Sequence, residues 1–480
     1  MDLGERFGPS HNARIVEEQL NRLDRSLLEE AYRGVGSAAY PPELMLKMVM
    51  FEMLEGRCSP AQWWRDARDH QALHWLGRGI QPSRTAWYDF RDRMGTVIPT
   101  LTASQIRQTI AEGLVSPEKG VQDGTTFRAC ASRHRMVNRK TLFRRQAWLY
   151  AAVAGSHSTA SPEELPSWMA GTFGGRLEQA AQFARAAEKL DQRIAENAKK
   201  PKDKRLSEDR VVVSLSDLEA YPGRDKEKVF CPLYTAQFVV EPKSLLVLAW
   251  DVFAQATDTG TLAPMIDLTK SIVGDRFKEM MADSTYATLL DLLACQARDV
   301  ELLAPVQENS FTQEKRAKKG TPANNREQFT WCPELHTYLC PQMHPLDYLG
   351  HSRKRRRNDQ FVIEHRFHCS PEHCRDCKDA SGCVRDPNKG RTLKQLEGQE
   401  ILDAHREKMK DPEIKVRYKI RGQVIERAFA DAKRHRNFRQ LHGRGLHRAI
   451  AEVGLLVLAQ NILTCHRLLL ARANSEEEQG

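Results

Sequence analysis

The chain has 480 residues, a formal net charge of +10 and a sequence pI near 9.0. This length is enough for roughly two to four domains and at least one large core, which excludes the class of small proteins that need disulfide or metal staples. The basic balance favours a polyanionic partner, with nucleic acid as the leading candidate. The N-terminus has no signal-peptide character and the longest apolar run, Val453–Ala459, is too short for a membrane span, so we expect a cytoplasmic, nucleoid-associated protein.

The N-terminal region is predicted to be helical. Apolar residues from Leu44 to Met53 recur at helical spacing, and Ser59 and Pro60 suit the cap and the first position of a second helix. Ser83 to Arg93 predicts a third helix, which carries Arg84. Two helices joined by a glycine-containing turn, the second one basic, are typical of a helix-turn-helix DNA reader. A plain helical bundle with solvated charges, or a dimerisation domain, gives the same pattern.

The character of the sequence changes after Gly120, where strands and helices begin to alternate. Val121–Phe127 predicts a short strand with Asp123 near its end. Asp283 closes another predicted strand, and Ser284 or Thr285 is expected to cap the helix that follows it. Alternating strands and helices favour an α/β core, in which ligands collect at the carboxyl ends of strands.

A cysteine-rich, basic segment interrupts this core. Its cysteines are Cys332, Cys340, Cys369, Cys374, Cys377 and Cys383. Cys374 and Cys377 are separated by two residues, which lets two thiolates on a tight turn reach one tetrahedral metal ion. Either Cys369 and Cys383, or Cys332 and Cys340, would complete the set. A structural zinc site and a group of reduced, partly buried thiols are the two interpretations.

The C-terminal region contains the helix-like stretch, Arg421–Lys433, on which our interpretation of the chain depends most. Arg421–Lys433 predicts a helix that begins just after Arg421, with Tyr418 and Arg421 on the entering loop. Its apolar residues form one face, and Glu426 and Lys433, seven residues apart, fall together on the margin of that face.

A basic run follows this helix and is either a solvated face or a contact for the nucleic-acid backbone. It extends from Lys433 to Arg448 without an acid and includes Arg436 and Arg439. Ala449–Leu470 predicts a strongly apolar helix that packs on the core, and the acidic residues after it form a frayed tail.

Three acids stand at positions suited to metal binding: Asp123 and Asp283 at strand ends and Glu426 at a helix edge. Three carboxylates within about 4 Å of one another repel by roughly 4 kcal/mol per charged pair, so such a cluster needs cations. Two Mg²⁺ ions would remove the repulsion and position a water or a 3′-hydroxyl in line with a scissile phosphate. No phosphate-binding glycine loop, nucleophile elbow or zinc-protease motif competes with this chemistry.

Four blocks of sequence, taken in order, resemble the blocks of DDE transposases from bacterial insertion sequences. They are Asp123–Ser132, Leu233–Gln237, Ala282–Ala287 and Glu426–Lys433. The resemblance also covers the helical N-terminal region, the cysteine-rich insertion and the last apolar helix, so it spans most of the chain.

The resemblance implies an RNase H-like core, similar to that of retroviral integrase, with a mixed sheet flanked by helices. Asp123, Asp283 and Glu426 would be the triad that binds two Mg²⁺ or Mn²⁺ ions. Lys433 would contact DNA phosphate, helped by Tyr418 and Arg421. The implied activity is cleavage at terminal inverted repeats and transfer of the 3′-OH ends to target DNA, by a homo-oligomer assembled on double-stranded DNA.

The expected domains and the competing functions complete these predictions. The domains are a helical N-terminal domain (1–115), a first part of the catalytic core (116–310) with a helical insertion (about 130–208), the cysteine-rich insertion (311–400), a second part of the core (401–472) and an acidic tail (473–480). The alternatives are a metal-dependent DNA nuclease without strand transfer and a domesticated DNA-binding regulator.

Overall fold

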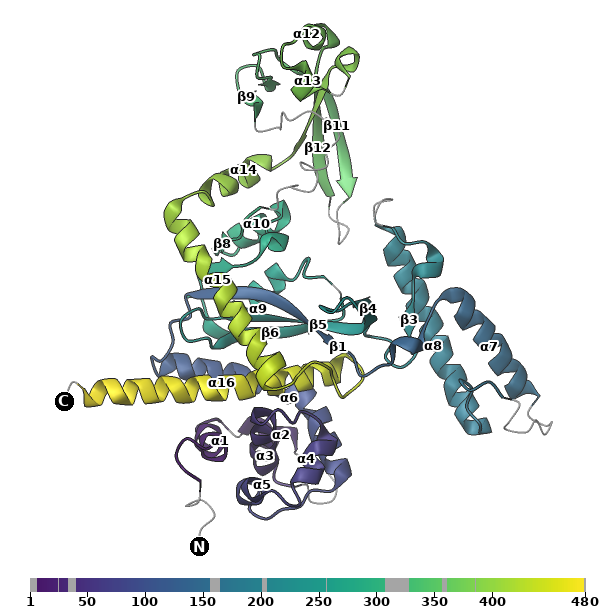
Figure 1. The fold of residues 1–480 in the computed structure, drawn as a ribbon, viewed down its shortest axis with the longest axis vertical. Helices are drawn as coiled ribbons and strands as arrows, with labels where there is room; N and C mark the ends of the chain where they lie inside the picture. The colour runs from purple at the N-terminus through teal and green to yellow at the C-terminus, as the bar shows by residue number, and fades with distance from the viewer. Residues whose placement is uncertain are drawn as a thin grey trace. The chain divides into compact units, whose positions relative to one another are not determined.

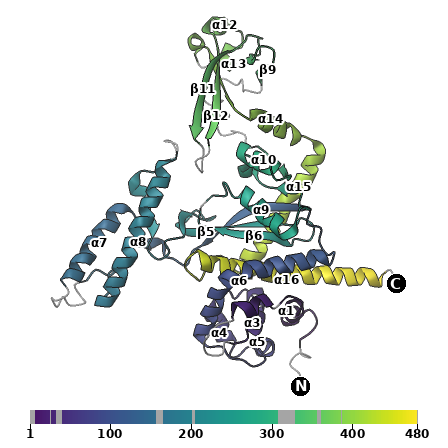
Figure 2. The same cartoon turned by 180° about the vertical axis from the view of Figure 1, so that it is seen from behind.

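The computed structural model describes nine stretches of the chain and divides it into two compact units (Figures 1 and 2). The described residues are 7–24, 26–32, 40–155, 165–200, 205–255, 257–306, 328–355, 361–384 and 386–478. The first unit comprises Met1–Ala282, Arg298–Glu301 and Lys419–Gly480, and the second comprises Asp283–Ala297 and Leu302–Tyr418.

The N-terminal part of the first unit is helical, as predicted. Its helices are α1 (Asn12–Asn21), α2 (Ser26–Ala31), α3 (Pro42–Leu54), α4 (Pro60–Asp66), α5 (Gln71–Leu76) and α6 (Arg84–Ala111). The predicted start of α4 is confirmed, because the Ser59 side chain accepts from the Gln62 amide and the Gln62 side chain accepts from the Ser59 amide. Ser83 caps α6, which continues well beyond the predicted end at Arg93.

Helix α6 is long because it packs along α16 (Leu446–Glu477), and both views show the two side by side (Figures 1 and 2). Gly95 permits this approach, since a Cβ there would lie 2.5 Å from the ring of His447. By length and composition α16 could cross a membrane, with a mean hydropathy of 1.6, but 67% of its most apolar window is buried. Core helices of soluble proteins share these properties, and α16 contacts the sheet as well as α6.

A mixed sheet forms the centre of the first unit. Its strands are β1 (Lys119–Arg128), β4 (Tyr221–Arg224), β5 (Phe230–Val240), β6 (Val247–Phe253), β7 (Glu279–Met281) and β8 (Glu301–Leu303). Strand β5 pairs antiparallel with β1, β4 and β6, whereas β7 pairs parallel with β1. The order is therefore β6-β5-β1-β7-β8, with β4 beside the first part of β5. The predicted α/β class is confirmed.

The two faces of this sheet are covered by different helices. Asp123 and Phe238 are directly opposite in the pairing of β1 with β5, so they share a face. Helix α15 (Pro412–Ala430) meets this face through Arg421 and Phe429. Helix α9 (Leu262–Val273) packs on β5 and β6, with Gln122 reaching Thr261 at its N-cap, on the opposite face.

A helical segment is inserted between β1 and β4 and has a core of its own. It contains β2 (Met136–Val137), α7 (Arg139–Ala154), α8 (Phe173–Ala198) and β3 (Val213–Ser214). Its buried side chains come from both helices and include Leu142, Leu149, Phe183 and Leu190. Both helices lie within the insertion predicted to be helical, about residues 130–208.

The second unit contains short helices and two small antiparallel sheets. Its elements are α10 (Leu289–Gln296), β9 (Thr330–Cys332), β10 (Thr337–Leu339), β11 (Asp347–Arg355), β12 (Phe361–Cys369), α12 (Pro371–Arg375), α13 (Ala380–Cys383), β13 (Arg391–Leu396) and α14 (Gln399–Lys408). Strand β9 pairs with β10, and β12 lies between β11 and β13. Part of the predicted basic run near Arg357 lies outside the described residues.

Two predicted boundaries are wrong. Neither Ser284 nor Thr285 caps the helix after Asp283; these residues lie in a 3₁₀ turn, and Thr288 caps α10 instead. The acidic residues predicted to form a frayed tail continue α16 as far as Glu477.

Candidate active site

Asp123 is engaged by a cation of the protein. Its Oδ1 accepts from the Gly124 amide at 2.8 Å, and its Oδ2 accepts from the Arg421 guanidinium at 2.9 Å. The Asp123 and Arg421 side chains are 21% and 17% exposed, so the pair is sheltered yet reachable from solvent. The prediction that Asp123 lies near the end of its strand is wrong, because β1 runs on to Arg128. The parallel pairing with β7, however, ends at Val121.

Arg421 reaches Asp123 because α15 starts earlier than predicted. The helix begins at Pro412, so Tyr418 and Arg421 are helical residues and the predicted entering loop is wrong. Gly422, which directly follows Arg421, does not interrupt the helix, because a glycine inside a helix is tolerated at a modest cost. The physical consequence is that Arg421 is held on a regular helix instead of a loop.

Glu426 lies one to two turns beyond Arg421 on α15 and is exposed. The predicted apolar face is confirmed, since Val424, Ile425, Ala428 and Phe429 are buried. Helix α15 ends at Ala430, and Asp431–His435 form a π-helical turn. Lys433 therefore does not continue the α-helical row that contains Glu426.

Lys433 is partly buried against β1. Its ammonium donates to the Thr126 carbonyl oxygen at 3.1 Å and lies 5.4 Å from the centre of the Phe127 ring. Burial, together with the nearby Lys226 ammonium, lowers the pKa of Lys433 to about 8. The Lys433 side chain is thus charged near neutral pH, but it loses its proton at a lower pH than an exposed lysine does.

Asp283 directly follows β7 and is the first residue of the second unit. Its Oδ1 accepts from the Thr285 amide at 2.7 Å and from the Thr285 hydroxyl. The register of the sheet aligns Val121 with Met281. Asp123 and Asp283 each come two residues after this pair along their own segments.

Sequence reasoning missed a polar network on the other face of β1. Gln122 donates to Gln237 at 3.1 Å, and Gln237 donates to Asp258 at 2.6 Å. A Cβ at Gly124 would lie 2.0 Å from Asp258 Oδ1 and 2.4 Å from Gln237 Nε2. Glycine therefore makes room for this network directly beside Asp123, and its place next to an acid in a strand was the available signal.

Two arginines of the predicted DNA-binding run have structural roles. Arg436 is 2% exposed, donates to Asp431 at 2.7 Å and to the Met53 carbonyl oxygen at 3.4 Å. The guanidinium is therefore buried and paired and is not presented to a phosphate, so its predicted role in DNA binding stays a prediction. Arg448 is likewise bonded to both carboxylate oxygens of Asp92, at 2.8 and 2.9 Å.

Two other predicted DNA contacts remain on the surface. Arg439 is exposed, although its Nε donates to the Lys433 carbonyl oxygen at 3.4 Å. Arg84 is exposed at the start of α6, and its guanidinium lies 5.7 Å from the centre of the Trp64 ring. Both are accessible to a phosphate backbone.

The carboxylates are chemically suited to Mg²⁺ or Mn²⁺, which prefer oxygen ligands. The Asp123 carboxylate already binds a cation, Arg421, so it carries the charge that such a site requires. Among the described residues, no three His, Cys, Asp or Glu side chains are grouped closely enough to hold a metal ion. The triad and the zinc ligands therefore stay predictions.

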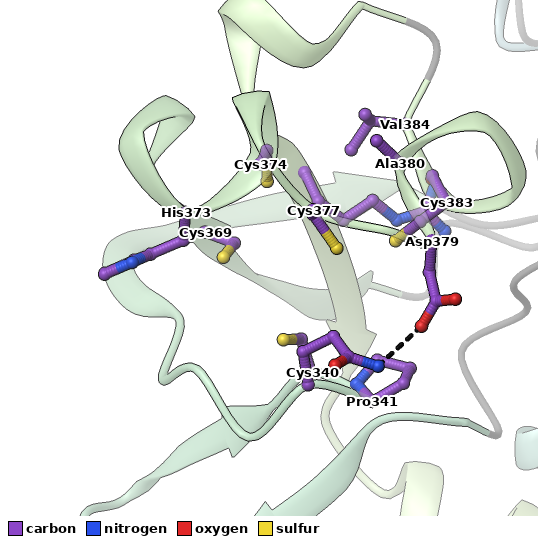
Figure 3. A pocket seen from close by; sticks show the side chains of 12 residues that line it. Cys340, Pro341, Cys369, His373, Cys374, Cys377, Asp379, Ala380, Cys383 and Val384 are labelled. Atoms are coloured by element: carbon purple, nitrogen blue, oxygen red, sulfur yellow. Dashed lines mark hydrogen bonds between the residues drawn. The ribbon is translucent and has the colours of Figure 1, made fainter.

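The cysteines predicted to bind zinc line one cavity of the second unit (Figure 3). Its thiols come from Cys340, Cys369, Cys374, Cys377 and Cys383. Cys332 does not line this cavity, whereas Cys340, one of the two alternative ligands, does.

Two families match the chain. Residues 339–466 match the family described as "Transposase DDE domain", and residues 1–93 match the family described as "Transposase domain (DUF772)". The first match includes Glu426 and Lys433, and the second covers α1 to α5 and the start of α6. Asp123 and Asp283 lie outside both matched ranges. No curated protein matches the sequence.

Proposed function

This chain belongs to the DDE transposases of insertion sequences, and we propose that it cuts DNA at the terminal inverted repeats of its own element and joins the 3′-OH ends to target DNA. The proposed chemistry is phosphoryl transfer with two divalent metal ions. The proposed catalytic residues are Asp123, Asp283 and Glu426.

The observation that carries this proposal is the register of the central sheet. The parallel pairing of β1 with β7 ends at Val121 and Met281, and Asp123 and Asp283 each stand two residues beyond this pair. The strand order β6-β5-β1-β7-β8, with β6, β5 and β1 antiparallel and β7 parallel to β1, supports an RNase H-like core. Helix α15, which carries Glu426, meets the face of the sheet that carries Asp123 through Arg421 and Phe429.

Each proposed catalytic acid is carried by a different type of secondary-structure element. Asp123 is fixed by a strand, Asp283 by the turn after a strand and Glu426 by a helix. When bound, Mg²⁺ or Mn²⁺ would supply the positive charge that stabilises the leaving oxygen of the scissile phosphate. The Arg421 guanidinium neutralises Asp123. We propose that this guanidinium turns to a DNA phosphate when the acids are otherwise neutralised.

The proposed partner is double-stranded DNA, both as repeat ends and as target. Lys433, Arg439 and Arg84 are the proposed backbone contacts, and the net charge of +10 favours such binding. Because two ends are cut and joined together, we propose that a homo-oligomer assembles on DNA, in the cytoplasm and associated with the nucleoid.

The test is cleavage and strand transfer on labelled repeat-end DNA in Mg²⁺. Asp123→Asn, Asp283→Asn and Glu426→Gln should each abolish both reactions and leave end binding largely intact. The matched control is Asp251→Asn, which changes an acid on β6 outside the proposed triad and should keep activity. Full activity of any triad variant would remove that residue from the proposal.

A nuclease that cuts without joining is the second candidate function, since the same acids would serve hydrolysis. Joined product in the Mg²⁺ assay excludes it, and cut ends that are never joined would favour it. A domesticated regulator predicts binding without either reaction.

A further inference from the structure

The cysteine-lined cavity of the second unit takes no part in the proposed reaction, and it brings together segments far apart in the sequence (Figure 3). Cys340 follows β10, Cys369 ends β12, and Cys374 and Cys377 lie in and after α12. Cys383 ends α13. Thiols from distant segments are thus gathered around one space.

The size of the cavity limits its occupant. Its volume is about 20 Å³, which is room for one ion or one water molecule. Thiolates from cysteine favour zinc among the common single ions, in a tetrahedral set with Zn–S distances of about 2.3 Å.

The backbone supports two of the thiols as ligands. Ser370 caps α12, and the turn after this short helix allows Cys374 and Cys377 to face the same space. Cys374 is buried and Cys377 is half-buried, so the turn leads from the interior to the surface. A pair spaced in this way is the usual half of a structural zinc site.

Cys340 is the third independent piece of support. The His344 amide donates to Cys340 Sγ at 3.3 Å, and the Cys340 amide donates to the His344 carbonyl oxygen at 2.9 Å. An amide that donates to a sulfur fixes the direction of that side chain, as hydrogen bonds do around metal ligands. Cys340 is therefore held in a tight loop in which its sulfur accepts a hydrogen bond.

Figure 3 shows how the sulfurs are directed. The sulfurs of all five cysteines border the cavity; Cys369, Cys374 and Cys383 belong to one buried cluster, and Cys340 packs against it. The sulfurs do not stand at ligating distances in the described structure. Rotation about the Cα–Cβ bonds moves a sulfur without moving the backbone, so the set can close on an ion.

We propose that four of the five thiols lining this cavity bind one zinc ion that stabilises the second unit, with Cys340, Cys374 and Cys377 among the ligands and Cys369 or Cys383 as the fourth. Cys332, one of the residues predicted from sequence as an alternative ligand, does not line the cavity. The small core here consists of a few aromatic and aliphatic side chains beside the thiols, so a metal adds stability where the apolar core is limited.

The test is metal analysis of the purified full-length protein and its single variants. The wild-type protein should contain about one equivalent of zinc. Cys340→Ser and Cys377→Ser should lose it, whereas only one of Cys369→Ser and Cys383→Ser should keep it. Cys295→Ser is the matched control, since Cys295 is buried in the same unit but does not line the cavity.

Misfolding is separated from loss of a ligand by a second variant and a second measurement. Cys377→His retains a zinc ligand at a half-buried position and should recover zinc that Cys377→Ser lacks. Cobalt replacing zinc should give the visible bands of a tetrahedral thiolate site. A wild-type protein with less than a tenth of an equivalent of zinc overturns the site, and zinc retained in full by Cys340→Ser overturns the proposed ligand set. None of these outcomes depends on transposase activity.

Discussion

The Asp123 carboxylate is bonded on both sides, by the Gly124 amide and by the Arg421 guanidinium. A carboxylate that is to bind a metal must first give up its protein cation. Because both side chains are partly exposed, this ion pair contributes only about 0.5–1 kcal/mol, so it can be exchanged. Arg421 is thus placed to compete with a metal for one oxygen of Asp123.

Arg421→Gln should raise the affinity for Mn²⁺ by about two- to fivefold, which is the free energy of that ion pair expressed as a binding ratio. Titration calorimetry with Mn²⁺ in the absence of DNA measures it. Arg439→Gln is the matched control, because it removes a surface arginine that does not contact Asp123. Equal Mn²⁺ affinity in the wild-type and Arg421→Gln proteins would contradict competition at Asp123.

Lys433 gives a prediction about pH. Its pKa is lowered to about 8, so the ammonium is charged at pH 7 and largely neutral at pH 9. If it contacts a phosphate, end-DNA affinity should fall severalfold through this window, and Lys433→Arg should flatten the fall. The effect of Lys433 on folding stability runs the other way. Burial of the charged ammonium lowers the free energy of unfolding, and this loss disappears as the pH rises above 8 and the group becomes neutral in the folded protein. A wild-type affinity that is unchanged between pH 7 and 9 would exclude the contact.

At the scale of the elements, β1 has two faces with different requirements. One face presents Asp123 to α15, and the other presents Gly124 to Asp258 and Gln237. An added methyl group at Gly124 would be too close to both polar groups. Strand β1 can therefore hold Asp123 in this position only if the next residue, Gly124, has no side chain.

Gly124→Ala should lower the free energy of unfolding by about 1–3 kcal/mol, the usual cost of overpacking. Gly422→Ala is the matched control on α15, where an added Cβ meets nothing within 4 Å. That change should stabilise the protein by about 0.5–1 kcal/mol, because alanine is the better helix former. Urea denaturation measures both, and changes of the same sign would contradict this account of β1.

Arg436 and Arg439 form a second matched pair, three residues apart. Arg436→Met leaves Asp431 without its buried partner and should cost about 3 kcal/mol of stability. Arg439→Met should change stability by less than about 0.5 kcal/mol and weaken DNA binding. Thermal denaturation and a DNA-binding titration separate the two roles, and the reverse pattern would favour Arg436 as a DNA contact.

At the scale of the whole molecule, local patterns predicted local structure well. The cap at Ser59 and the buried face of α15 follow from side-chain chemistry and helical spacing, and both are confirmed. The start of α15 was predicted wrongly because Gly422 resembles a boundary, while packing against the sheet keeps the helix continuous. The burial of Arg436 depends on Met53, which is distant in sequence and leaves no local signal.

For the candidate site, too, the residues could be selected from local sequence patterns, whereas their tertiary contacts could not. The acids Asp123, Asp283 and Glu426 could be selected from their predicted places at strand ends and on a helix edge, although Asp123 lies inside β1. The extension of β1 beyond Asp123 could not, because it is set by the long antiparallel pairing with β5. The ion pair of Asp123 with Arg421 likewise depends on how α15 lies on the sheet.

The central claim is that Asp123, Asp283 and Glu426 bind divalent metal ions together. Its most direct test is anomalous diffraction from crystals of the protein with repeat-end DNA and Mn²⁺. We expect two manganese peaks coordinated by these three carboxylates, with Arg421 released from Asp123. Manganese bound elsewhere, or an Asp123–Arg421 pair that persists with no metal beside it, would contradict the account.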